Sequence, residues 1–266
     1  ERGESMKPVT LISLEDLSEW REEQFLNNET VALVPTMGAL HPGHLSLVVA
    51  AKDKASKIVV STFVNPKQFG PNEDFAKYPR TINDDLEKLA ALNVDAVFMP
   101  NAAQIYPTDF QTSLHNSSMS KGLCGASRPG HFDGVLTVVL KLFNLVRPDY
   151  AAFGKKDYQQ LKVIEQMVSD LCLPVTIIKG ETVRDEDGLA LSSRNKFLSD
   201  TQRPVATRII TALKACEEVY KSGTRNKETL TEAFMKVISE NSEVRLDYFE
   251  IRSQDRLQEI DEAELT

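Results

Sequence analysis

Two histidines three residues apart, His41 and His44, carry the clearest chemical signal in this sequence. They belong to a segment, Pro35–His44, that follows the apolar run Val31–Val34 and leads into a helical pattern. Glycines in such a turn let the backbone approach phosphate oxygens, and the first N–H groups of a helix attract anions. Imidazoles beside them can stabilise the charge of a pentavalent α-phosphate. We therefore interpret the segment as a nucleotide site, with two ordinary surface histidines in a turn as the plainer alternative.

The next loop along the chain has the composition of a small-molecule pocket. Asn65 and Gln68 supply hydrogen-bonding amides, and Phe63 and Phe69 on either side could form apolar walls. Because Asn-Pro is also common turn chemistry, this segment alone leaves a plain loop equally open.

Two later loops contain groups that suit a nucleotide. Gly154 allows close approach of the backbone, Lys156 can pair with a phosphate, and Asp157 suits a helix cap or a ribose hydroxyl. In the other loop, Ser192–Arg194 suits oxyanion contacts and closure over a nucleotide. A capped loop between strand and helix and a helix-capping pair of serines are the respective alternatives. The chain contains no G-x-x-x-x-G-K-[ST] and no G-x-G-x-x-G pattern that would bind phosphates instead.

Asp84 and Asp85 are adjacent acids at the start of a predicted helix and could help to hold Mg²⁺. Acids in a first helical turn more often complement the helix dipole, which is the interpretation that these two residues alone favour.

The elements that must position these loops follow from periodicity. Short apolar runs rich in β-branched residues predict strands buried on both faces at Val31–Val34, Ile58–Phe63, Val94–Met99, Tyr150–Phe153 and Val175–Ile178. Amphipathic patterns predict helices at Leu45–Ala55, Ile82–Leu92, Val135–Val146 and Leu161–Leu171. Ser13 with Asp16 and Thr81 with Asp84 have the spacing of helix-capping pairs. Alternating strands and helices predict an α/β fold with a doubly wound, parallel, Rossmann-like sheet.

The pattern changes near residue 180. Helices are predicted over Asp200–Lys221 and Lys227–Glu240, followed by a strand over Val244–Ile251. We therefore expect a large domain at residues 1–182 and a smaller C-terminal α+β domain at residues 183–266, with a hinge near Glu181–Val183.

Composition excludes several classes of protein. The 266 residues carry a formal net charge of -8, which disfavours a dedicated nucleic-acid binder. The most apolar stretch, Gly134–Val146, is interrupted by Lys141 and is too short to span a membrane, and the N-terminus lacks the apolar region of a secretory signal. Three cysteines without a C-x-x-C pair indicate neither a zinc ribbon nor a disulfide framework and suggest a reducing cytosol.

Taken together, the chain resembles the pantoate–β-alanine ligase family of HxGH nucleotidyltransferases. From about Val31 through Ile251 it contains, in the family's order, PTMGALH-x-GH, FVNP-x-QF, YPRT, RPGHF-x-GV, FG-x-KDYQQL and DGLA-x-SSRN. The resemblance implies a two-step reaction that uses ATP as a substrate. Pantoate and ATP give pantoyl adenylate and pyrophosphate, and β-alanine then displaces AMP. It further implies a cytoplasmic homodimer, with a C-terminal lid over a domain that binds ATP and pantoate, and with no nucleic-acid or membrane partner.

The resemblance also implies roles for individual residues. An ATP site is expected at Met37, Gly38, Ala39, Leu40, His41, Pro42, Gly43, His44, Gly154, Lys155, Lys156, Asp157, Val183, Leu191, Ser192, Ser193 and Arg194. Of these, His44 is expected to act as the catalytic acid, with His41 and Lys156 assisting. Substrate contacts are expected from Gln68, Gln160, Asn65, Arg128 and His131. Asp84 and Asp85 match acids associated with Mg²⁺, which reverses the preference from the two residues alone.

Two departures from the family pattern stand out. Pro42 replaces a polar or acidic residue between the histidines, and we expect it to stiffen the loop more than to change the chemistry. The chain ends at Thr266, where the pattern continues into a further strand of the small domain. The alternatives to this function are a nucleotidyltransferase that adenylylates a phosphorylated acceptor and a catalytically silent nucleotide-binding protein.

Overall fold

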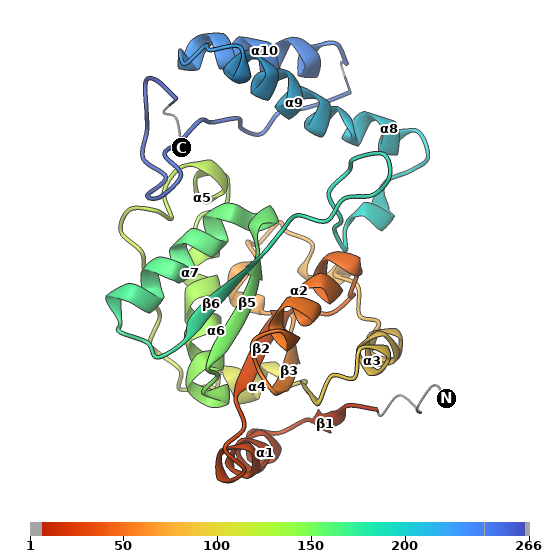
Figure 1. Cartoon of the computed structure of the whole chain (residues 1–266), viewed down its shortest axis with the longest axis vertical. Coiled ribbons are helices and arrows are strands. Elements are labelled where there is room, and N and C mark those ends of the chain that lie inside the picture. The colour runs from red at the N-terminus through yellow and green to blue at the C-terminus, as the bar shows by residue number, and fades with distance from the viewer. Residues whose placement is uncertain (1–6, 242, 264–266) are drawn as a thin grey trace.

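The computed structural model describes residues 7–241 and 243–263. A six-stranded sheet forms its centre, and every neighbouring pair of strands is parallel, in the order β1-β4-β3-β2-β5-β6 (Figure 1). The strands are β1 (Val9–Leu11), β2 (Val31–Thr36), β3 (Lys57–Thr62), β4 (Ala96–Phe98), β5 (Tyr150–Gly154) and β6 (Thr176–Gly180). The doubly wound parallel sheet predicted from the sequence is thereby confirmed.

Two strands differ from the prediction. β1 was missed because it has three residues, of which only Leu11 is buried, so it leaves almost no periodic signal. β6 was predicted to be buried on both faces, which is wrong. It lies at the edge of the sheet, where Thr176 is exposed and Ile177 and Ile178 are only half-buried. A strand at the edge has a neighbouring strand on one side only, so more of its surface stays open to solvent than in a central strand.

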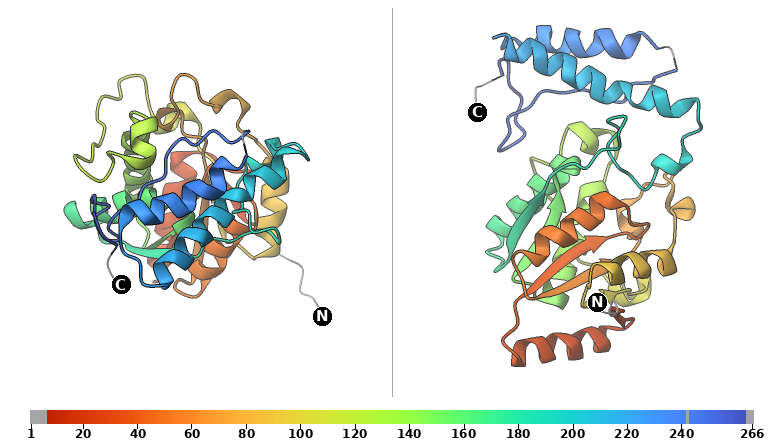
Figure 2. Two further views of the ribbon diagram at one scale, coloured as in Figure 1. Left: turned by 90° about the horizontal axis from the view of Figure 1, so that it is seen from above. Right: turned by 45° about the vertical axis from the view of Figure 1, so that its right-hand side comes forward.

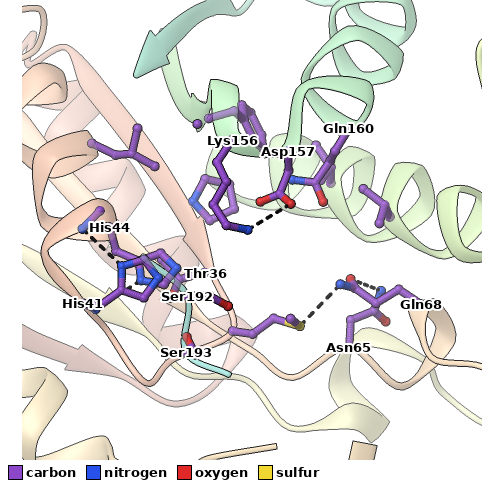
Figure 3. A pocket seen from close by; sticks show the side chains of 18 of the residues that line it. Thr36, His41, His44, Asn65, Gln68, Lys156, Asp157, Gln160, Ser192 and Ser193 are labelled. Carbon is purple, nitrogen blue, oxygen red and sulfur yellow. Dashed lines mark hydrogen bonds and ion pairs between the residues drawn. The ribbon is translucent and has the colours of Figure 1, made fainter. Parts of the chain in front are cut away.

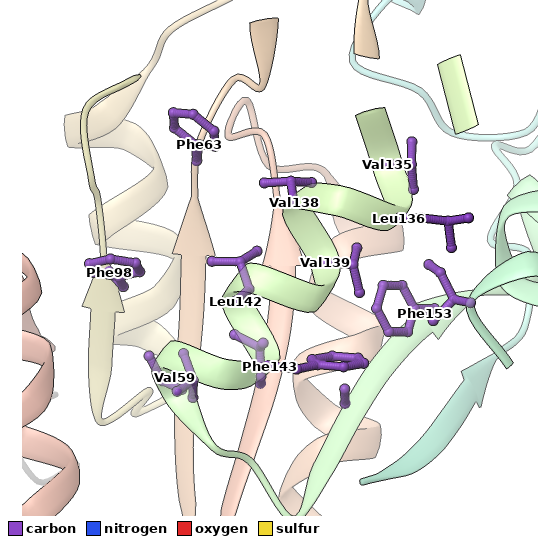
Figure 4. Packing of buried hydrophobic residues seen from close by; sticks show 14 of the residues in the cluster. Val59, Phe63, Phe98, Val135, Leu136, Val138, Val139, Leu142, Phe143 and Phe153 are labelled. Atoms are coloured by element: carbon purple, nitrogen blue, oxygen red, sulfur yellow. The ribbon is translucent and has the colours of Figure 1, made fainter. Parts of the chain in front are cut away.

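The sheet is covered on both faces. Along β2, Val31 and Leu33 contribute to one hydrophobic cluster and Ala32 and Val34 to another, as the alternation of side chains along a strand requires. The first cluster includes residues of α1 (Leu14–Leu26), α6 (His131–Val146) and α7 (Tyr158–Asp170). The second includes residues of α2 (Pro42–Lys52) and α3 (Ile82–Ala91). In Figure 4, α6 lies across the sheet, with Leu142 and Phe143 beside the strand residues Val59 and Phe153.

Several helix starts follow local rules. The predicted capping pair at α1 is confirmed, since Ser13 and Asp16 each accept the backbone N–H of the other at 3.0 Å. The predicted pair Thr81–Asp84 is wrong, because Asp84 forms an ion pair with Lys88 and the hydroxyl of Thr81 donates to Asp85 instead. α2 begins at Pro42, three residues before the predicted start.

Short helices connect these elements. They are α4 (Ala102–Ile105), α5 (Leu123–Ser127) and the 3₁₀ turns η1 (Pro66–Gln68), η2 (Phe75–Lys77), η3 (Lys155–Asp157) and η4 (Asn195–Phe197). None of the described helices is long and apolar enough to cross a membrane.

The C-terminal part forms a separate layer. α8 (Gln202–Ala206), α9 (Arg208–Lys221) and α10 (Lys227–Ser239) lie beyond the end of the sheet, as the right-hand view of Figure 2 shows. The long helix predicted over 200–221 is divided at Thr207, which serves as the last cap of α8 and the first of α9. α9 and α10 share a small core in which Phe249 stacks on Phe234 at 3.8 Å between ring centroids.

The strand predicted over Val244–Ile251 is wrong. The segment forms no ladder with any strand among the described residues, and Phe249 attaches it to α10 instead. An apolar, alternating sequence becomes a strand only where another backbone supplies hydrogen bonds beside it.

Candidate active site

A cavity of about 250 Å³ lies at the carboxyl ends of the central strands. β2 is the point where the strand order reverses, since β3 lies on one side of it and β5 on the other. Parallel sheets bind ligands at such a point, because the loops after the two strands diverge and leave a crevice between them. The cavity brings together residues predicted from five separate segments: Met37, His41, Gly43, His44, Asn65, Gln68, Arg128, His131, Gly154, Lys156, Asp157, Gln160, Val183, Leu191, Ser192, Ser193 and Arg194.

Part of the cavity wall was missed in the sequence. Val135, Val138, Val139 and Leu142 of α6 line it, together with Thr36. Their pattern is that of an amphipathic helix facing a core, so nothing in the sequence separates a wall of a cavity from ordinary packing. The wall expected at Phe63 and Phe69 does line the cavity.

The two histidines cap the first turn of α2 with their side chains. His41 is the N-cap residue, and its Nδ1 accepts the N–H of Gly43 at 3.1 Å. Nδ1 of His44 accepts the N–H of His41 at 3.3 Å. This is the reciprocal geometry of a capping box, with imidazoles in place of hydroxyl and carboxylate. Because both Nδ1 atoms accept, each neutral ring carries its proton on Nε2 and offers that N–H as a donor.

The surroundings keep both rings neutral. Burial lowers the pKa of His44 to about 3, and the neighbouring His41 and Lys156 act in the same direction. Burial and then Lys156 also lower the pKa of His41. Lys156 extends toward the histidines from the opposite loop, with Asp157 3.4 Å from its amine (Figure 3). The pair therefore acts as two hydrogen-bond donors in the free protein and not as two cations.

Glycine between the histidines has a steric reason. A Cβ at Gly43 would lie 2.8 Å from the ring of His41, closer than real carbon contacts. Pro42 occupies the first helical position, where its fixed φ suits the helix and its missing N–H is not needed. The H-P-G-H order thus builds the turn as well as the site.

The loop before the histidines is held from outside the cavity. Gly38 and Ala39 have φ of 80° and 51°, in the left-handed region that non-glycine residues rarely adopt. The N–H groups of Ala39 and Leu40 donate to the two carboxylate oxygens of Asp85, at 2.9 and 2.7 Å. Lys88 also donates to the carbonyl oxygen of Leu40 at 2.8 Å. α3 therefore holds the strained turn by two of its N–H groups and one of its carbonyl oxygens.

Some predicted ATP-site residues are not in the cavity wall. Gly38, Ala39 and Leu40 turn toward α3 and the core, and Pro42 is exposed at the start of α2. Lys155 forms an ion pair with Glu181 instead of lining the cavity. None of these five residues lines the cavity; for Ala39 and Leu40 the reason is that Asp85 of α3 binds their backbone N–H groups.

Asp84 and Asp85 do not fit a shared Mg²⁺ site. Asp85 is 3% exposed, and both of its oxygens already accept backbone N–H groups. The side chain of Asp84 is 60% exposed and pairs with Lys88 at 2.6 Å. Adjacent helical residues point about 100° apart, so the two carboxylates cannot converge on one ion. Within residues 7–241 and 243–263, no cluster of three or more His, Cys, Asp or Glu side chains suits a metal.

Replacing Asp85 with asparagine tests its role in the turn. The amide retains one acceptor but turns an N–H₂ group toward a backbone N–H, so we expect the free energy of unfolding to fall by about 1–3 kcal/mol. A displaced turn should also slow catalysis by roughly tenfold or more. Asp84→Asn should change neither quantity. Equal losses in both variants, together with a raised Mg²⁺ requirement, would restore the pair as metal ligands.

Asn65 and Gln68 face the histidines across the pocket in Figure 3. Asn65 is 1% exposed, and its Nδ2 donates to Gln68 Oε1 at 3.0 Å and to the carbonyl oxygen of Gly134 at 3.1 Å. A Cβ at Gly134 would lie 2.2 Å from the carbonyl oxygen of Lys67, so only glycine lets η1 pack this closely on α6. Asn65 was predicted to bind substrate, but its amide is directed at Gln68 and at the backbone.

Two arginines at the cavity are each bound by an acid. Arg128 contacts both carboxylate oxygens of Glu73, at 2.9 and 2.6 Å, and Arg194 contacts both oxygens of Asp74, each at 2.7 Å. These hydrogen bonds lower the pKa of Glu73 and of Asp74. His131 accompanies Arg128, and since its Nδ1 lies 2.9 Å from the carbonyl oxygen of Gln68, its Nε2 accepts from the guanidinium. Neither acid was singled out in the sequence.

The segment 183–194, which leads into the C-terminal part, contacts the turn before His41. Val183 and Leu191 are brought together because the segment between them folds back, with an N–H···O bond of 3.0 Å joining the two residues. The hydroxyl of Ser193 donates to the carbonyl oxygen of Ala39 at 3.0 Å. Residues far apart in the sequence therefore enclose one cavity. Hydrogen-bond donors that could bind phosphate line one part of it, and α6 supplies an apolar wall.

The chain is similar in sequence and structure to one family of known proteins. The family model described as pantoate-beta-alanine ligase matches residues 10–266. A pantothenate synthetase from Thermotoga petrophila is 45% identical over 252 residues, which are 95% of this chain and 90% of that protein. Pantothenate synthetase from Thermus thermophilus has a similar solved structure, with a TM-score of 0.90 at 41% identity, covering 96% of this chain and 90% of that one. Pantoate-β-alanine ligase from Francisella tularensis, solved in complex with β-γ ATP and β-alanine, has a TM-score of 0.76 at 37% identity and covers 86% of each chain.

Proposed function

The chain belongs to the pantoate-β-alanine ligase family, and from that membership we propose that it condenses pantoate with β-alanine through a pantoyl adenylate. It is an ATP-binding ligase of pantothenate biosynthesis. In the first proposed step, the carboxylate of pantoate attacks the α-phosphorus of ATP and pyrophosphate leaves. In the second, the amine of β-alanine attacks the acyl carbon and AMP leaves.

The observation that supports this mechanism most directly is the pair of neutral histidines at the strand-reversal point. Both histidines and Lys156 line the cavity, and with both Nδ1 atoms engaged the Nε2–H groups and the amine are the donors that these residues have to offer. Attack at the α-phosphorus increases the negative charge on its equatorial oxygens, and preorganised donors stabilise that charge without a cost of reorganisation. We propose that His44, His41 and Lys156 perform this task.

We propose that pantoate binds between Gln68, Gln160 and the apolar wall of α6. Pantoate has two methyl groups on one carbon, two hydroxyls and a carboxylate. The methyl groups suit the side chains of Val138 and Val139, and the oxygens suit the amides.

The pyrophosphate end is proposed to lie at Ser192, Ser193 and Arg194. Arg194 already forms a bidentate pair with Asp74, and a phosphate offers a similar pair of acceptor oxygens. Bound ATP would thus replace Asp74 as the partner of the Arg194 guanidinium, which Asp74 holds in place in the free protein. We also propose that residues 183–266 act as a lid on residues 1–182, because an acyl adenylate must be protected from water.

Three further properties are proposals. Mg²⁺ is proposed to enter with the triphosphate, since it commonly keeps several waters and binds through substrate phosphates. A cytoplasmic location agrees with the three free cysteines, Cys124, Cys172 and Cys216. A homodimer is expected from the family resemblance described above.

Release of AMP tests the function as a whole. We expect AMP to form only when ATP, pantoate and β-alanine are all present, and pantothenate to form in equal amount. Turnover of a phosphorylated acceptor in place of pantoate would instead indicate a different nucleotidyltransferase. ATP binding without any turnover would indicate a silent relative.

Gln68→Ala and Gln160→Ala should each raise the KM for pantoate while leaving the KM for ATP nearly unchanged. Each substitution removes a hydrogen bond to a charged substrate, a loss of roughly 1.5–3 kcal/mol or about 10- to 150-fold. Initial rates measured against each substrate separate the two constants. If the KM for ATP rises and that for pantoate holds, the proposed division of the cavity is wrong.

A further inference from the structure

A chain of hydrogen bonds runs from the back of the cavity wall to Gln68. We infer that Tyr106, which does not line the cavity, is a positioning residue for pantoate that acts through Asn65 to orient the amide of Gln68. This inference rests on the proposed function and adds a residue to it.

Two backbone groups determine which way the amide of Asn65 faces. Its Oδ1 lies 3.2 Å from the N–H of Lys67, which can only donate. Its other amide atom lies 3.1 Å from the carbonyl oxygen of Gly134, which can only accept. Exchanging the nitrogen and the oxygen of Asn65 would place like groups together at both positions. The orientation is therefore set without reference to any ligand.

The orientation of Asn65 then determines that of Gln68. The second hydrogen of Asn65 Nδ2 points at Gln68, so the atom that it meets, at 3.0 Å, must be Oε1. Nε2 of Gln68 is left to face the cavity, where its protein partner is Met37 Sδ at 3.4 Å. Thioether sulfur is a weak acceptor, so an incoming oxygen can replace it readily. Gln68 thus presents donors, which suit a carboxylate or hydroxyl oxygen of the substrate.

Tyr106 completes this arrangement from outside. It follows α4, and its hydroxyl lies 2.8 Å from Oδ1 of Asn65, which makes it the second donor to that oxygen. Burial raises the pKa of Tyr106, so the hydroxyl keeps its proton. The ring is itself held by Phe63 and Phe110, at centroid distances of 6.4 and 5.1 Å. All four hydrogen-bonding positions of the Asn65 amide are therefore used.

Tyr106→Phe should raise the KM for pantoate by roughly three- to tenfold, the factor expected for one intramolecular hydrogen bond. The KM for ATP should stay within about twofold of its original value, because the histidine end of the cavity is not involved. Tyr158→Phe is the matched control. Like Tyr106, Tyr158 lies outside the cavity wall and its hydroxyl donates a hydrogen bond, but the acceptor is the carbonyl oxygen of Gln254, at 3.0 Å, and not Asn65. This substitution should leave the KM for pantoate unchanged.

A double-mutant cycle distinguishes positioning from general destabilisation. If Tyr106 acts through Gln68, then Tyr106→Phe should have almost no further effect on the KM for pantoate in a Gln68→Ala protein. The same factor in both backgrounds would overturn the inference, because it would show that Tyr106 acts independently. An unchanged KM in the single variant would overturn it as well. Absence of pantoate-dependent AMP release from the unaltered protein would overturn the proposed function and this inference together.

Discussion

His44→Ala is expected to slow formation of the adenylate by roughly 10²–10³-fold, the loss that follows removal of one preorganised donor to a transition-state oxyanion. The structure gives a specific reason for so large an effect. Nδ1 of His44 accepts a backbone N–H, so Nε2–H is the group left to face the cavity. Asparagine or glutamine at this position should recover part of the rate, because an amide also carries an N–H donor.

The neutral state of His44 makes a further measurement informative. Its pKa is about 3 in the folded protein and near the ordinary value of 6.5 in the unfolded chain. The unfolded chain therefore binds the proton more readily between these values, and the stability contributed by the neutral ring is lost as pH falls from 6.5 toward 3. Between about pH 7 and pH 5, the Tm of the His44→Ala variant should therefore fall by less than the Tm of the unaltered protein.

The catalytic role of His44 is tested separately by turnover. A folded His44→Ala variant that turns over as fast as the unaltered protein would refute that role.

The second large effect concerns which phosphorus is attacked. With labelled pyrophosphate, ATP, Mg²⁺ and pantoate, the protein should transfer label into ATP without β-alanine, and omission of pantoate should abolish the exchange. A carboxylate must be activated before an amine can displace its oxygen, and ATP can provide an acyl phosphate or an acyl adenylate. Donors at a strand-to-helix turn and the absence of a P-loop sequence favour attack at the α-phosphorus.

Product analysis is the control for that experiment. Pyrophosphate and AMP should appear in complete reactions, and ADP should not. ADP and inorganic phosphate would show attack at the γ-phosphorus and would contradict the adenylate mechanism. Exchange that persists without pantoate would show that ATP adenylylates a group of the protein reversibly instead.

Local sequence patterns were sufficient for the central strands of the sheet. Apolar runs such as Val31–Val34 and Tyr150–Phe153 became central parallel strands, because a strand buried on both faces has to be apolar along its whole length. The loops with unusual polar residues follow those strands, and parallel strands bring their carboxyl ends to one edge. The sequence thus predicted both the sheet and the place where a cavity forms. Where a segment depended on a distant partner, as with Val244–Ile251, the pattern misled.

The partners of individual side chains depended on the folded chain. Asp85 matched a metal-associated motif, yet it clamps a turn that lies 45 residues earlier in the sequence. Tyr106 lies 41 residues from Asn65, and Arg194 lies 120 residues from Asp74. Hydrogen bonds and ion pairs form only when the two atoms lie about 3 Å apart. No periodic pattern along a chain shows which two distant segments will come that close together. Residue types therefore revealed which groups could react, and the packing of the chain assigned each of them its partner.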